Sequence, residues 1–393
     1  MKRILFINSV CYGSTGRICL DLYKLAEENG YECCIAYGRG EAPNGYKTIK
    51  IGNEFDVYAH VAKTRLFDEH GFGSKKATTL FLKQIELYKP DIIHLHNIHG
   101  YYINIELLFI YLKQHKEIKV IWTLHDCWTF TGHCSNFIYS QCDKWENECY
   151  KCPEIRSYPQ NIIYSNVSLN FKRKKQLFTN LENLILVTPS VWLNNLIKKS
   201  FLKNYESLVI HNGIDLSTFR IKKNRIQSNK LIILGVANVW NQRKGLDTFL
   251  ELSRENVENL QIVLVGLTKK QMKNLPSNVI GIGKTNNIEE LVDLYNRADV
   301  LFNPTLEDNY PTVNLEAQAC GTPVITFDAG GAKETLYSNN SFTIENLQDF
   351  LKLIKMNDFK QLKKFFICNT NEIDKNIKLK EYIVLYDKIL GKG

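Results

Sequence analysis

NPTLEDNYPTVNLEAQACGTPVITF, residues 303–327, carries the clearest structural signals in this chain. It predicts the end of a buried strand, an acidic loop, a short helix over 312–320, a tight Gly-Thr-Pro turn and a second apolar strand. The helix begins just after Pro311, so its first amides are unpaired donors at the positive end of the helix dipole, where a phosphate binds well. Glu316, one turn further on, could accept hydrogen bonds from the vicinal hydroxyls of a ribose. Together with the acids of the loop, these features predict a nucleotide-sugar site.

The composition is that of an ordinary globular protein. With 393 residues, 44% hydrophobic and 23% charged, the chain is long enough for two domains with their own cores. No apolar run approaches the roughly 18 residues of a membrane span. The start, MKRILFINSV, is too short in its apolar part for a signal peptide and leads into an expected helix, so we interpret it as a first strand. We therefore expect a cytoplasmic protein.

The net charge of +9 leaves three classes of partner open. Lys172-Arg173-Lys174-Lys175 is the densest basic run, and Lys198, Lys199 and Lys203 follow on a second expected helix. These residues are either solvated helix faces or a surface attracted to anionic lipid head groups at the inner face of the membrane. Nucleic acid ranks last, because no recognition motif accompanies the charge.

The N-terminal half alternates strands and helices, which is typical of a doubly wound parallel sheet. Apolar runs that end in polar residues are expected strands: RILFINSV, YECCIAYG, DIIHLHN, KVIWTLHD and LILVTPS. A helix is expected over 17–29. In such sheets ligands gather at the carboxyl ends of the strands. The residues that follow the strands are therefore the candidates for chemistry: Gly13 to Arg17, His96, His125 and Asp126.

The C-terminal half repeats this alternation, which predicts a second Rossmann-like unit. The expected organisation has three parts: 1–206 as a first domain with a Cys-rich insert over 127–159, 207–374 as a nucleotide-sugar-binding domain, and 375–393 as a C-terminal helix that packs back on the first domain.

Residues 303–327 resemble the E-x7-E region of retaining glycosyltransferases of GT-B architecture, the family commonly numbered four, in its bacterial surface-polysaccharide branch. The second Glu of that pattern falls on Glu316, and the family's following small-residue turn falls on Ala317 to Val324. The first Glu falls on Asp308, with Glu307 one residue out of register, so that either acid could take the first role. SLVIHNGIDLSTF, residues 207–219, is similar to the hinge of that family.

The resemblance implies a set of donor-binding residues. The basic loop WNQRKG places Lys244 on the lysine that holds the donor diphosphate, and Arg243 could replace the family's arginine, whose position is Val239 here. Gly283 ends the strand beside the pocket for the base. The remaining donor residues follow the acidic loop: Glu307, Asn309, Tyr310, Pro311, Thr312, Val313 and Glu316, with Asp308 as a catalytic acid.

The first domain would contribute the acceptor side. Gly13, Gly16 and Arg17 lie between the first strand and the expected helix, where glycines allow backbone amides to approach an anion. His125 matches a family His near the reacting sugar carbon, with a hydrogen-bonding role. Asp126 is either an acceptor-side base or a cap of the next segment.

The Cys-rich insert carries four sulfurs within nineteen residues: Cys134, Cys142, Cys149 and Cys152. In a reducing cytosol such clustering indicates a metal before disulfides, and four thiolates suit a closed structural zinc site. The alternative is four free buried thiols. Catalysis itself requires no cofactor in this interpretation, since no metal-ligand set accompanies the donor residues.

The sequence thus predicts an α/β, two-domain retaining hexosyltransferase that uses a nucleotide-diphosphate sugar and a polysaccharide or lipid-linked oligosaccharide acceptor. Two alternatives stay open. A nucleotide-sugar epimerase of the same architecture would need no acceptor. A catalytically silent scaffold in a polysaccharide synthase complex would bind donor without turnover.

Overall fold

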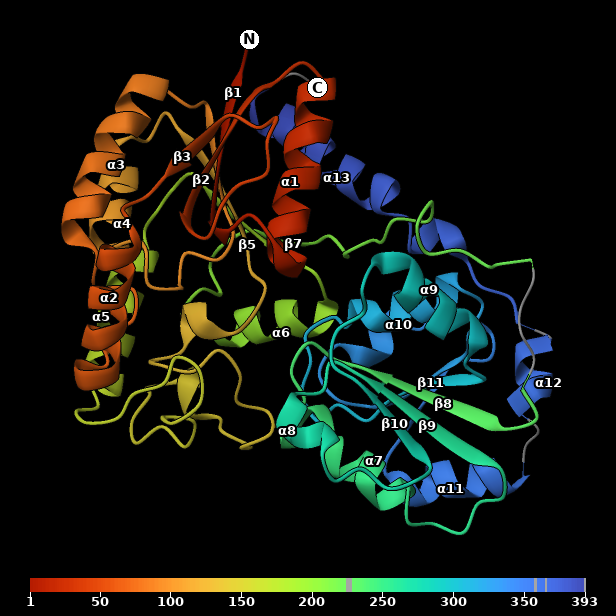
Figure 1. The fold of residues 1–393 in the computed structure, drawn as a ribbon. Helices are drawn as coiled ribbons and strands as arrows, with labels where there is room; N and C mark the ends of the chain where they lie inside the picture. Colours follow the sequence, from red (N-terminus) through yellow and green to blue (C-terminus); the bar gives the residue numbers. More distant parts are fainter. Residues whose placement is uncertain (224–227, 357–358, 365, 392–393) are drawn as a thin grey trace. The chain divides into compact units, whose positions relative to one another are not determined.

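The computed structural model describes residues 1–223, 228–356, 359–364 and 366–391. The chain divides into two compact units (Figure 1). Unit 1 comprises Met1–Ile210 and Leu379–Gly393, and unit 2 comprises His211–Lys378. These boundaries lie beside the expected ones at 206/207 and 374/375.

Within the described residues, unit 1 is a seven-stranded sheet with the order β3-β2-β1-β4-β5-β6-β7, in which every neighbouring pair is parallel. Its strands are β1 (Arg3–Val10), β2 (Glu32–Arg39), β3 (Thr48–Lys50), β4 (Ile92–Leu95), β5 (Lys119–Thr123), β6 (Leu184–Thr188) and β7 (Ser207–Val209). Its helices are α1 (Gly13–Glu28), α2 (Glu54–Phe67), α3 (Lys75–Tyr88), α4 (Ile105–Gln114), α5 (Val167–Phe178), α6 (Val191–Lys199) and most of α13 (Lys375–Ile389), with short 3₁₀ helices at Trp128–Phe130 and Lys144–Glu146.

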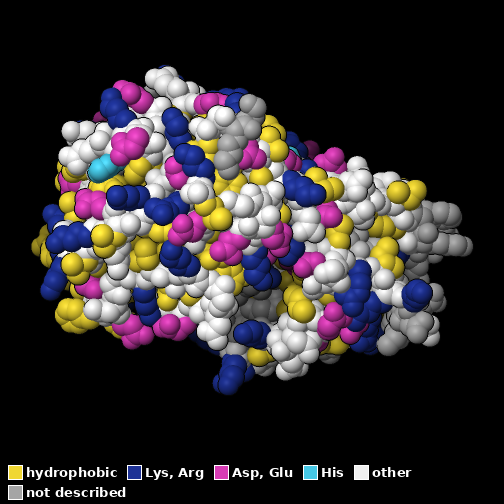
Figure 2. All heavy atoms as spheres, turned by 90° about the horizontal axis from the view of Figure 1, so that it is seen from above, with side chains coloured by type: hydrophobic (Ala, Val, Ile, Leu, Met, Phe, Trp, Pro, Cys, Tyr) yellow, Lys and Arg dark blue, Asp and Glu magenta, His cyan; other side chains and the backbone are white. Residues whose placement is uncertain are grey.

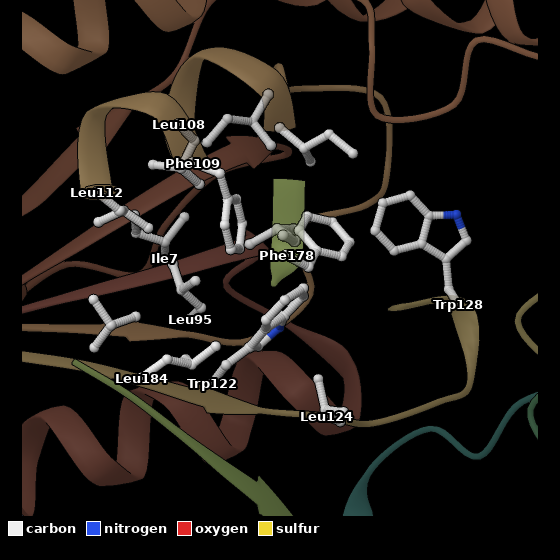
Figure 3. Close-up of a cluster of buried hydrophobic side chains, with 14 of the residues drawn as sticks. Ile7, Leu95, Leu108, Phe109, Leu112, Trp122, Leu124, Trp128, Phe178 and Leu184 are labelled. Carbon is white, nitrogen blue, oxygen red and sulfur yellow. The ribbon is translucent and has the colours of Figure 1, made fainter. Parts of the chain in front are cut away.

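One face of this sheet is covered by α3, α4, α5 and α6. Figure 3 shows how Phe109 of α4 and Phe178 of α5 meet Trp122 of β5 in the middle of this core. The ring centroids of Phe109 and Phe178 are 4.5 Å apart, and those of Trp122 and Phe178 are 5.0 Å apart. Strands buried on both faces read as near-continuous apolar runs, which is why β1, β4 and β5 were recognisable in the sequence.

The opposite face is covered by α1 and the C-terminal helix α13. His94 of β4 is fully buried there, and its two ring nitrogens are hydrogen bonded to the Tyr386 hydroxyl of α13 and the Thr123 hydroxyl of β5, at 2.8 Å each. His94 thus joins the C-terminal helix to the sheet through a satisfied buried polar group.

Two details differ from the sequence expectations. Helix α1 begins at Gly13 instead of Arg17, so Gly13 to Arg17 form its first turn and are not a loop before it. The basic run of α5 is also not one charged face, because Lys174 is buried while Lys172 and Arg173 pair with Glu148 and Glu106. Figure 2 shows one face of the molecule on which Lys and Arg side chains are interspersed with Asp and Glu.

Within the described residues, unit 2 is a six-stranded parallel sheet with the order β10-β9-β8-β11-β12-β13. Its strands are β8 (Leu231–Val236), β9 (Leu260–Val265), β10 (Val279–Ile282), β11 (Val300–Asn303), β12 (Val324–Phe327) and β13 (Phe342–Ile344). Its helices are α7 (Leu246–Leu252), α8 (Lys269–Met272), α9 (Ile288–Arg297), α10 (Thr312–Ala319), α11 (Leu347–Met356) and α12 (Phe359–Lys364), with short 3₁₀ helices at Gln242–Lys244, Ala332–Thr335 and Thr370–Glu372.

Helices α7, α11 and α12 pack on one face of this second sheet, and α9 and α10 pack on the other. Among the helices of the described residues, none is long and apolar enough to cross a membrane. Each unit is therefore a sheet between two helical layers, the arrangement that parallel sheets require to cover both faces.

The buried imidazole of His94 predicts a pH dependence of stability. Burial lowers the pKa of His94 to about 3, from an ordinary value of 6.5. Between these values the unfolded chain binds a proton that the folded chain does not, so stability falls as the pH falls below 6.5, by up to about 1.4 kcal/mol per pH unit for this group. We expect His94→Gln to reduce the slope of unfolding free energy against pH between 6.5 and 4, measured by urea unfolding.

His115→Gln is the matched control, because the ring of His115 is partly exposed at the end of α4 beside Glu117. Its slope should stay close to that of the unmodified chain. An unchanged slope in His94→Gln would show that His94 does not take part in the acid destabilisation.

Candidate active site

The sheet of unit 2 reverses its strand order between β8 and β11. From β8 the sheet is extended on one side by β9 and then β10. From β11 it is extended on the other side by β12 and then β13. In open α/β sheets, such a switch point leaves a crevice beyond the carboxyl ends of the two central strands. The loop 237–245 follows β8 and the loop 304–311 follows β11, so the two loops meet at this point.

An ion pair joins these loops. Lys244 Nζ lies 2.5 Å from Asp308 Oδ2, and the two side chains are 26% and 21% exposed. The amide of Leu306 also donates to the carbonyl oxygen of Arg243 at 2.8 Å. The structure therefore brings together Lys244 and Asp308, which are distant in sequence, at the strand ends where a ligand is expected.

Glycines hold the two loops at this short separation. Gly245 has a φ of +78°, and a Cβ there would lie 2.3 Å from the carbonyl oxygen of Pro304. Gly330 has a φ of +63°, and a Cβ there would lie 2.0 Å from the carbonyl oxygen of Asp308, which accepts a hydrogen bond from the Gly331 amide. Only a residue without a side chain fits either position, so these glycines support the backbone around the ion pair.

Helix α10 carries the second acid. Glu316 is buried, and its Oε2 accepts a hydrogen bond from the Tyr295 hydroxyl of α9 at 2.8 Å. Burial and the neighbouring Glu316 carboxylate raise the pKa of Tyr295 well above its ordinary range, so the phenol stays protonated and donates. Pro311 precedes the helix without a side-chain cap, which leaves the first amides of α10 without a capping side chain.

The other residues predicted around the donor fall into three environments. Asn309, Thr312 and Val313 are partly exposed. Glu307 is buried, and the Tyr310 ring stacks on His211 with centroids 5.1 Å apart, so only the backbone of Tyr310 remains for a ligand. Gly283 directly follows β10, and a Cβ there would be 3.3 Å from the carbonyl oxygen of Leu267.

Unit 1 has its own switch point, between β1 and β4. Asn8 bridges it, because its Oδ1 accepts from the Asn97 amide at 3.2 Å and its Nδ2 donates to the Val10 carbonyl oxygen at 2.9 Å. Helix α1 begins directly after β1, and a Cβ at Gly16 would lie 2.7 Å from the Cys11 backbone. The side chain of Arg17 bonds back to the Gly13 carbonyl oxygen at 3.3 Å.

Two histidines meet beside this edge. His125, just after β5, has its Nε2 3.1 Å from Nδ1 of His96, just after β4. Burial lowers the pKa of His125 to about 4 and that of His96 well below its ordinary range. Both rings are therefore neutral near pH 7, which suits hydrogen bonding and not proton donation.

Asp126 has partners that the sequence did not reveal. Its Oδ2 lies 2.9 Å from His99 Nε2, and His99 Nδ1 lies 3.1 Å from the Tyr158 hydroxyl. Asp126 Oδ1 also accepts from the Trp128 amide at 2.9 Å, the capping role left open earlier. Although burial opposes it, the His99 contact and the Trp128 amide keep the pKa of Asp126 below its usual value, so it is a carboxylate at neutral pH.

Sequence reasoning missed His99, His70 and Tyr158. His70 lies in the middle of this group, with the rings of Tyr101, Trp128 and Tyr158 at centroid distances of 4.7, 5.5 and 5.5 Å. Its Nε2 accepts from the Gly100 amide, while its buried Nδ1 has no hydrogen-bond partner among the described residues. The only available signal was the position of His99 shortly after a strand end; nothing local pointed to His70 or Tyr158.

One small cavity is lined by four of the five cysteines of the insert, Cys134, Cys142, Cys149 and Cys152, together with His133 and Trp145. The Cys134 thiol is hydrogen bonded to Cys152, which lowers the pKa of Cys152 to about 7. His133 is engaged elsewhere, since its Nδ1 lies 2.5 Å from Asp68 Oδ1. Among the residues that the structure describes, no three metal-ligating side chains are placed to hold one ion together. The cavity fits a thiol cluster, and zinc at this cluster stays a prediction.

Comparison with known proteins relates both units to one enzyme class. Residues 217–355 match the family described as Glycosyl transferases group 1. The putative colanic acid biosynthesis glycosyl transferase WcaC of Escherichia coli (strain K12) is 27% identical over 362 residues, which cover 88% of this chain and 87% of that protein. The N,N'-diacetylbacillosaminyl-diphospho-undecaprenol alpha-1,3-N-acetylgalactosaminyltransferase of Campylobacter jejuni is 24% identical over 255 residues, covering 62% of this chain and 64% of that protein.

Solved structures match along the whole chain. Sucrose-phosphate synthase from Thermosynechococcus elongatus has a TM-score of 0.70 at 14% identity and covers 100% of both chains. HepE of Anabaena, solved in complex with UDP-glucose, has a TM-score of 0.61 at 13% identity and covers 99% of this chain and 100% of that chain. At these identities the likeness shows the fold, which is the predicted GT-B arrangement of two Rossmann-like units.

The predicted zinc gives a direct test of the cysteine cluster. If zinc binds Cys134, Cys142, Cys149 and Cys152, elemental analysis of the purified protein should find about one zinc per chain. Cys149→Ser should then lower both the zinc content and the thermal stability, because thiolate ligation couples metal binding to local folding.

Cys368→Ser is the control, since Cys368 lies in unit 2 outside the cluster. Metal-free protein of full stability, with all four thiols titrating freely, would exclude the zinc site.

Proposed function

We propose that this glycosyltransferase, whose residues 217–355 carry the pattern of the glycosyl transferases group 1, moves a hexose from a nucleoside-diphosphate sugar to a polysaccharide or lipid-linked oligosaccharide with retention of configuration. The observation that carries the proposal is the meeting of Lys244 and Asp308 at the switch point of unit 2, with Glu316 on the helix that follows. A partly exposed cation, helix amides without a side-chain cap and a buried carboxylate are the groups that a sugar diphosphate with a ribose requires.

Lys244 is the proposed contact to the diphosphate. Breaking the bond between the sugar C1 and the diphosphate oxygen leaves negative charge on the phosphate, and fixed positive groups aimed at that charge stabilise the transition state. Asp308 balances the charge of Lys244 in the ligand-free protein. Arg243 precedes Lys244 on the same short 3₁₀ helix, and the first turn of α10 adds backbone donors.

Glu316 is the proposed ribose contact. Its Oε2 is held by Tyr295, which fixes the orientation of the carboxylate before any ligand binds. Glu307 and Asp308 remain the two candidates for the first acidic role. Asp308 is the better one, because its side chain is partly exposed and reaches Lys244, whereas Glu307 is buried.

Unit 1 supplies the proposed acceptor side. His125 is neutral and therefore suits a hydrogen bond to a hydroxyl of the donor sugar. Asp126 is an oriented carboxylate that suits a hydrogen bond to the acceptor, and His99 and Tyr158 support it. In a front-face reaction, the acceptor oxygen bonds to C1 as the diphosphate leaves, and the acceptor proton passes to the departing phosphate oxygen. Gly13, Gly16 and Arg17 would face the anion from the start of α1.

The acceptor class is inferred from relatives. The names of the two relatives refer to colanic acid biosynthesis and to a diphospho-undecaprenol acceptor, so we infer a surface polysaccharide or its lipid-linked precursor as the product. Such acceptors are assembled at the inner face of a membrane, which makes this a cytoplasmic enzyme that works at the membrane surface. The structural match to HepE with UDP-glucose favours a uridine nucleotide.

The first experiment is a panel of nucleotide sugars assayed for slow hydrolysis and for transfer to lipid-linked and free oligosaccharides. One donor that is turned over much faster with acceptor supports the proposal. An epimerised sugar from donor alone would instead identify an epimerase, and donor binding without any turnover would favour a silent scaffold.

Substitutions in unit 2 give a sharper prediction. Lys244→Ala should lower kcat by about 10²–10³, the usual effect of removing one donor to a developing charge. Glu316→Gln should raise KM for the donor, because a ribose contact is lost while the hydrogen bond from Tyr295 can persist.

Both effects are measured with saturating acceptor. Lys269→Ala, an exposed residue of α8, is the control and should behave like the unmodified chain. Near-normal turnover in both site variants would refute the assignment of the donor site.

A further prediction concerns divalent metal. Lys244, Arg243 and the amides of α10 supply positive charge where other enzymes use a metal ion, so transfer should persist in EDTA during short assays. Rapid loss that magnesium or manganese restores would show a metal-dependent reaction. Slow loss with unfolding, followed by circular dichroism, would point to the cysteine cluster instead.

A further inference from the structure

Helix α2 of unit 1, labelled in Figure 1, exposes large apolar side chains to solvent, and its inner side combines the buried polar residues His60 and Thr64 with the half-buried Val57 and Val61. Its buried residues are His60 and Thr64, whereas Phe55 and Tyr58 are 80% and 70% exposed. Leu66, eleven positions after Phe55, points to the same side of the helix and is also exposed. A surface helix normally turns its apolar stripe to the core. Within the described residues, Phe55, Tyr58 and Leu66 are therefore not part of the hydrophobic core of unit 1.

The inward side of α2 is held by hydrogen bonds. His60 Nε2 accepts from the amides of Gly71 and Gly73 at 3.1 and 3.2 Å, and His60 Nδ1 lies 2.9 Å from the Ser74 hydroxyl. The next residue inward, Thr64, donates to the His60 carbonyl oxygen. These bonds fix α2 over the loop that carries His70. These hydrogen bonds thus set which side of α2 is exposed to solvent.

A second segment extends this stripe. The buried Asn161 side chain donates to the carbonyl oxygens of Thr64 and Arg65, and the Tyr164 amide donates to that of Leu66 at 3.0 Å. The rings of Phe67 and Tyr164 are parallel within 3°, with centroids 6.1 Å apart. Together these residues form one outer apolar surface: Phe55, Tyr58, Leu66, Phe67, Ile162, Ile163 and Tyr164.

Basic side chains beside this surface provide positive charge for an anionic partner. Lys63, Arg65 and Arg156 are exposed next to it, and Arg156 Nη1 donates to the carbonyl oxygens of Asn161 and Ile162. In the part of the chain that the structure describes, none of these three forms an ion pair with an acid, although Glu54 and Asp56 occupy the first turn of α2. The basic run of α5 offers less accessible positive charge, because Lys174 is buried while Lys172 and Arg173 form ion pairs.

We propose that the outer apolar surface docks unit 1 on a bilayer that contains anionic lipid. Aromatic and aliphatic side chains on one side of a helix, with bases along the edge, are the features of a helix that lies in the membrane interface. The bases would contact lipid phosphates while Phe55, Tyr58 and Ile163 enter the head-group boundary. The proposal moves the expected membrane contact from the lysines of α5 and α6 to α2.

The outer apolar surface is linked to the proposed acceptor site by a short stretch of chain and by buried rings. Tyr158, whose hydroxyl bonds to His99, precedes Ile162 by four residues, and His60 under α2 lies 6.4 Å from His70 between ring centroids. A lipid-linked acceptor could therefore keep its lipid in the membrane while its glycan reaches Asp126. This role in presenting a lipid-linked acceptor rests on the proposed function, whereas the docking of α2 on a membrane does not.

Vesicle flotation of the full chain tests the proposal. The unmodified protein should float with vesicles of phosphatidylglycerol and phosphatidylcholine and much less with phosphatidylcholine alone. Phe55→Ser combined with Tyr58→Ser should weaken the partition by at least about tenfold, since each removes an inserting side chain. Lys63→Gln combined with Arg65→Gln should weaken binding to the anionic vesicles specifically. Val384→Ser, an apolar residue 68% exposed on α13, is the control and should float like the unmodified chain.

Donor hydrolysis without vesicles should be unchanged in all three variants, which separates docking from catalysis. Flotation with no turnover of any nucleotide sugar would reject the proposed function and keep the docking surface. Turnover without flotation, or equal flotation of Phe55→Ser/Tyr58→Ser and the unmodified chain, would overturn the docking surface. A dimer in sedimentation analysis that this double variant disrupts would also overturn it, because a second copy would then cover the face.

Discussion

In both units the strands run parallel, so that the residues following them gather at one edge of each sheet. The order of strands reverses once in each sheet, between β1 and β4 and between β8 and β11, and the helices leave opposite ways at that point. Lys244 and Asp308 meet only because β8 and β11 are hydrogen-bonded neighbours. The proposed chemistry of unit 2 therefore depends on the strand order of a parallel sheet, which places the loops after β8 and β11 side by side. Gly245 and Gly330 then allow the backbones of these loops and their neighbours to approach closely.

Unit 1 differs in that it buries several histidine side chains. Burial lowers the pKa of His60, His94 and His125, so these rings are neutral and act as paired donors and acceptors. His94 joins the C-terminal helix to the sheet, and His60 turns α2 so that its apolar side faces outward. One residue type thus supports the fold at one place and an exposed apolar surface at another, and the difference lies in the neighbours of each ring.

The sequence predicted the fold well where the signal was local. Continuous apolar runs located β1, β4, β5, β8 and β11, and Pro311 located the start of α10 at Thr312. It was wrong about the start of α1, because Gly13 and Gly16 looked like a loop while the backbone turns into the helix directly after β1. The sequence also suggested that the lysines of α5 form one exposed charged run. In the structure Lys174 is buried, with its ammonium 3.7 Å from the centroid of the Trp128 ring.

Local patterns in the chain were enough to predict the two parallel α/β units, the cation and the carboxylates of the donor segment, and the clustering of cysteines. These follow from periodicity and from motifs whose residues are close together in the chain. The folded chain was needed to show that Asp308 and not Glu307 faces Lys244, that His99 and Tyr158 support Asp126, and that α2 exposes its large apolar side chains. Such pairings depend on which strand ends and loops become neighbours, and a linear pattern does not contain the hydrogen bonds that hold them.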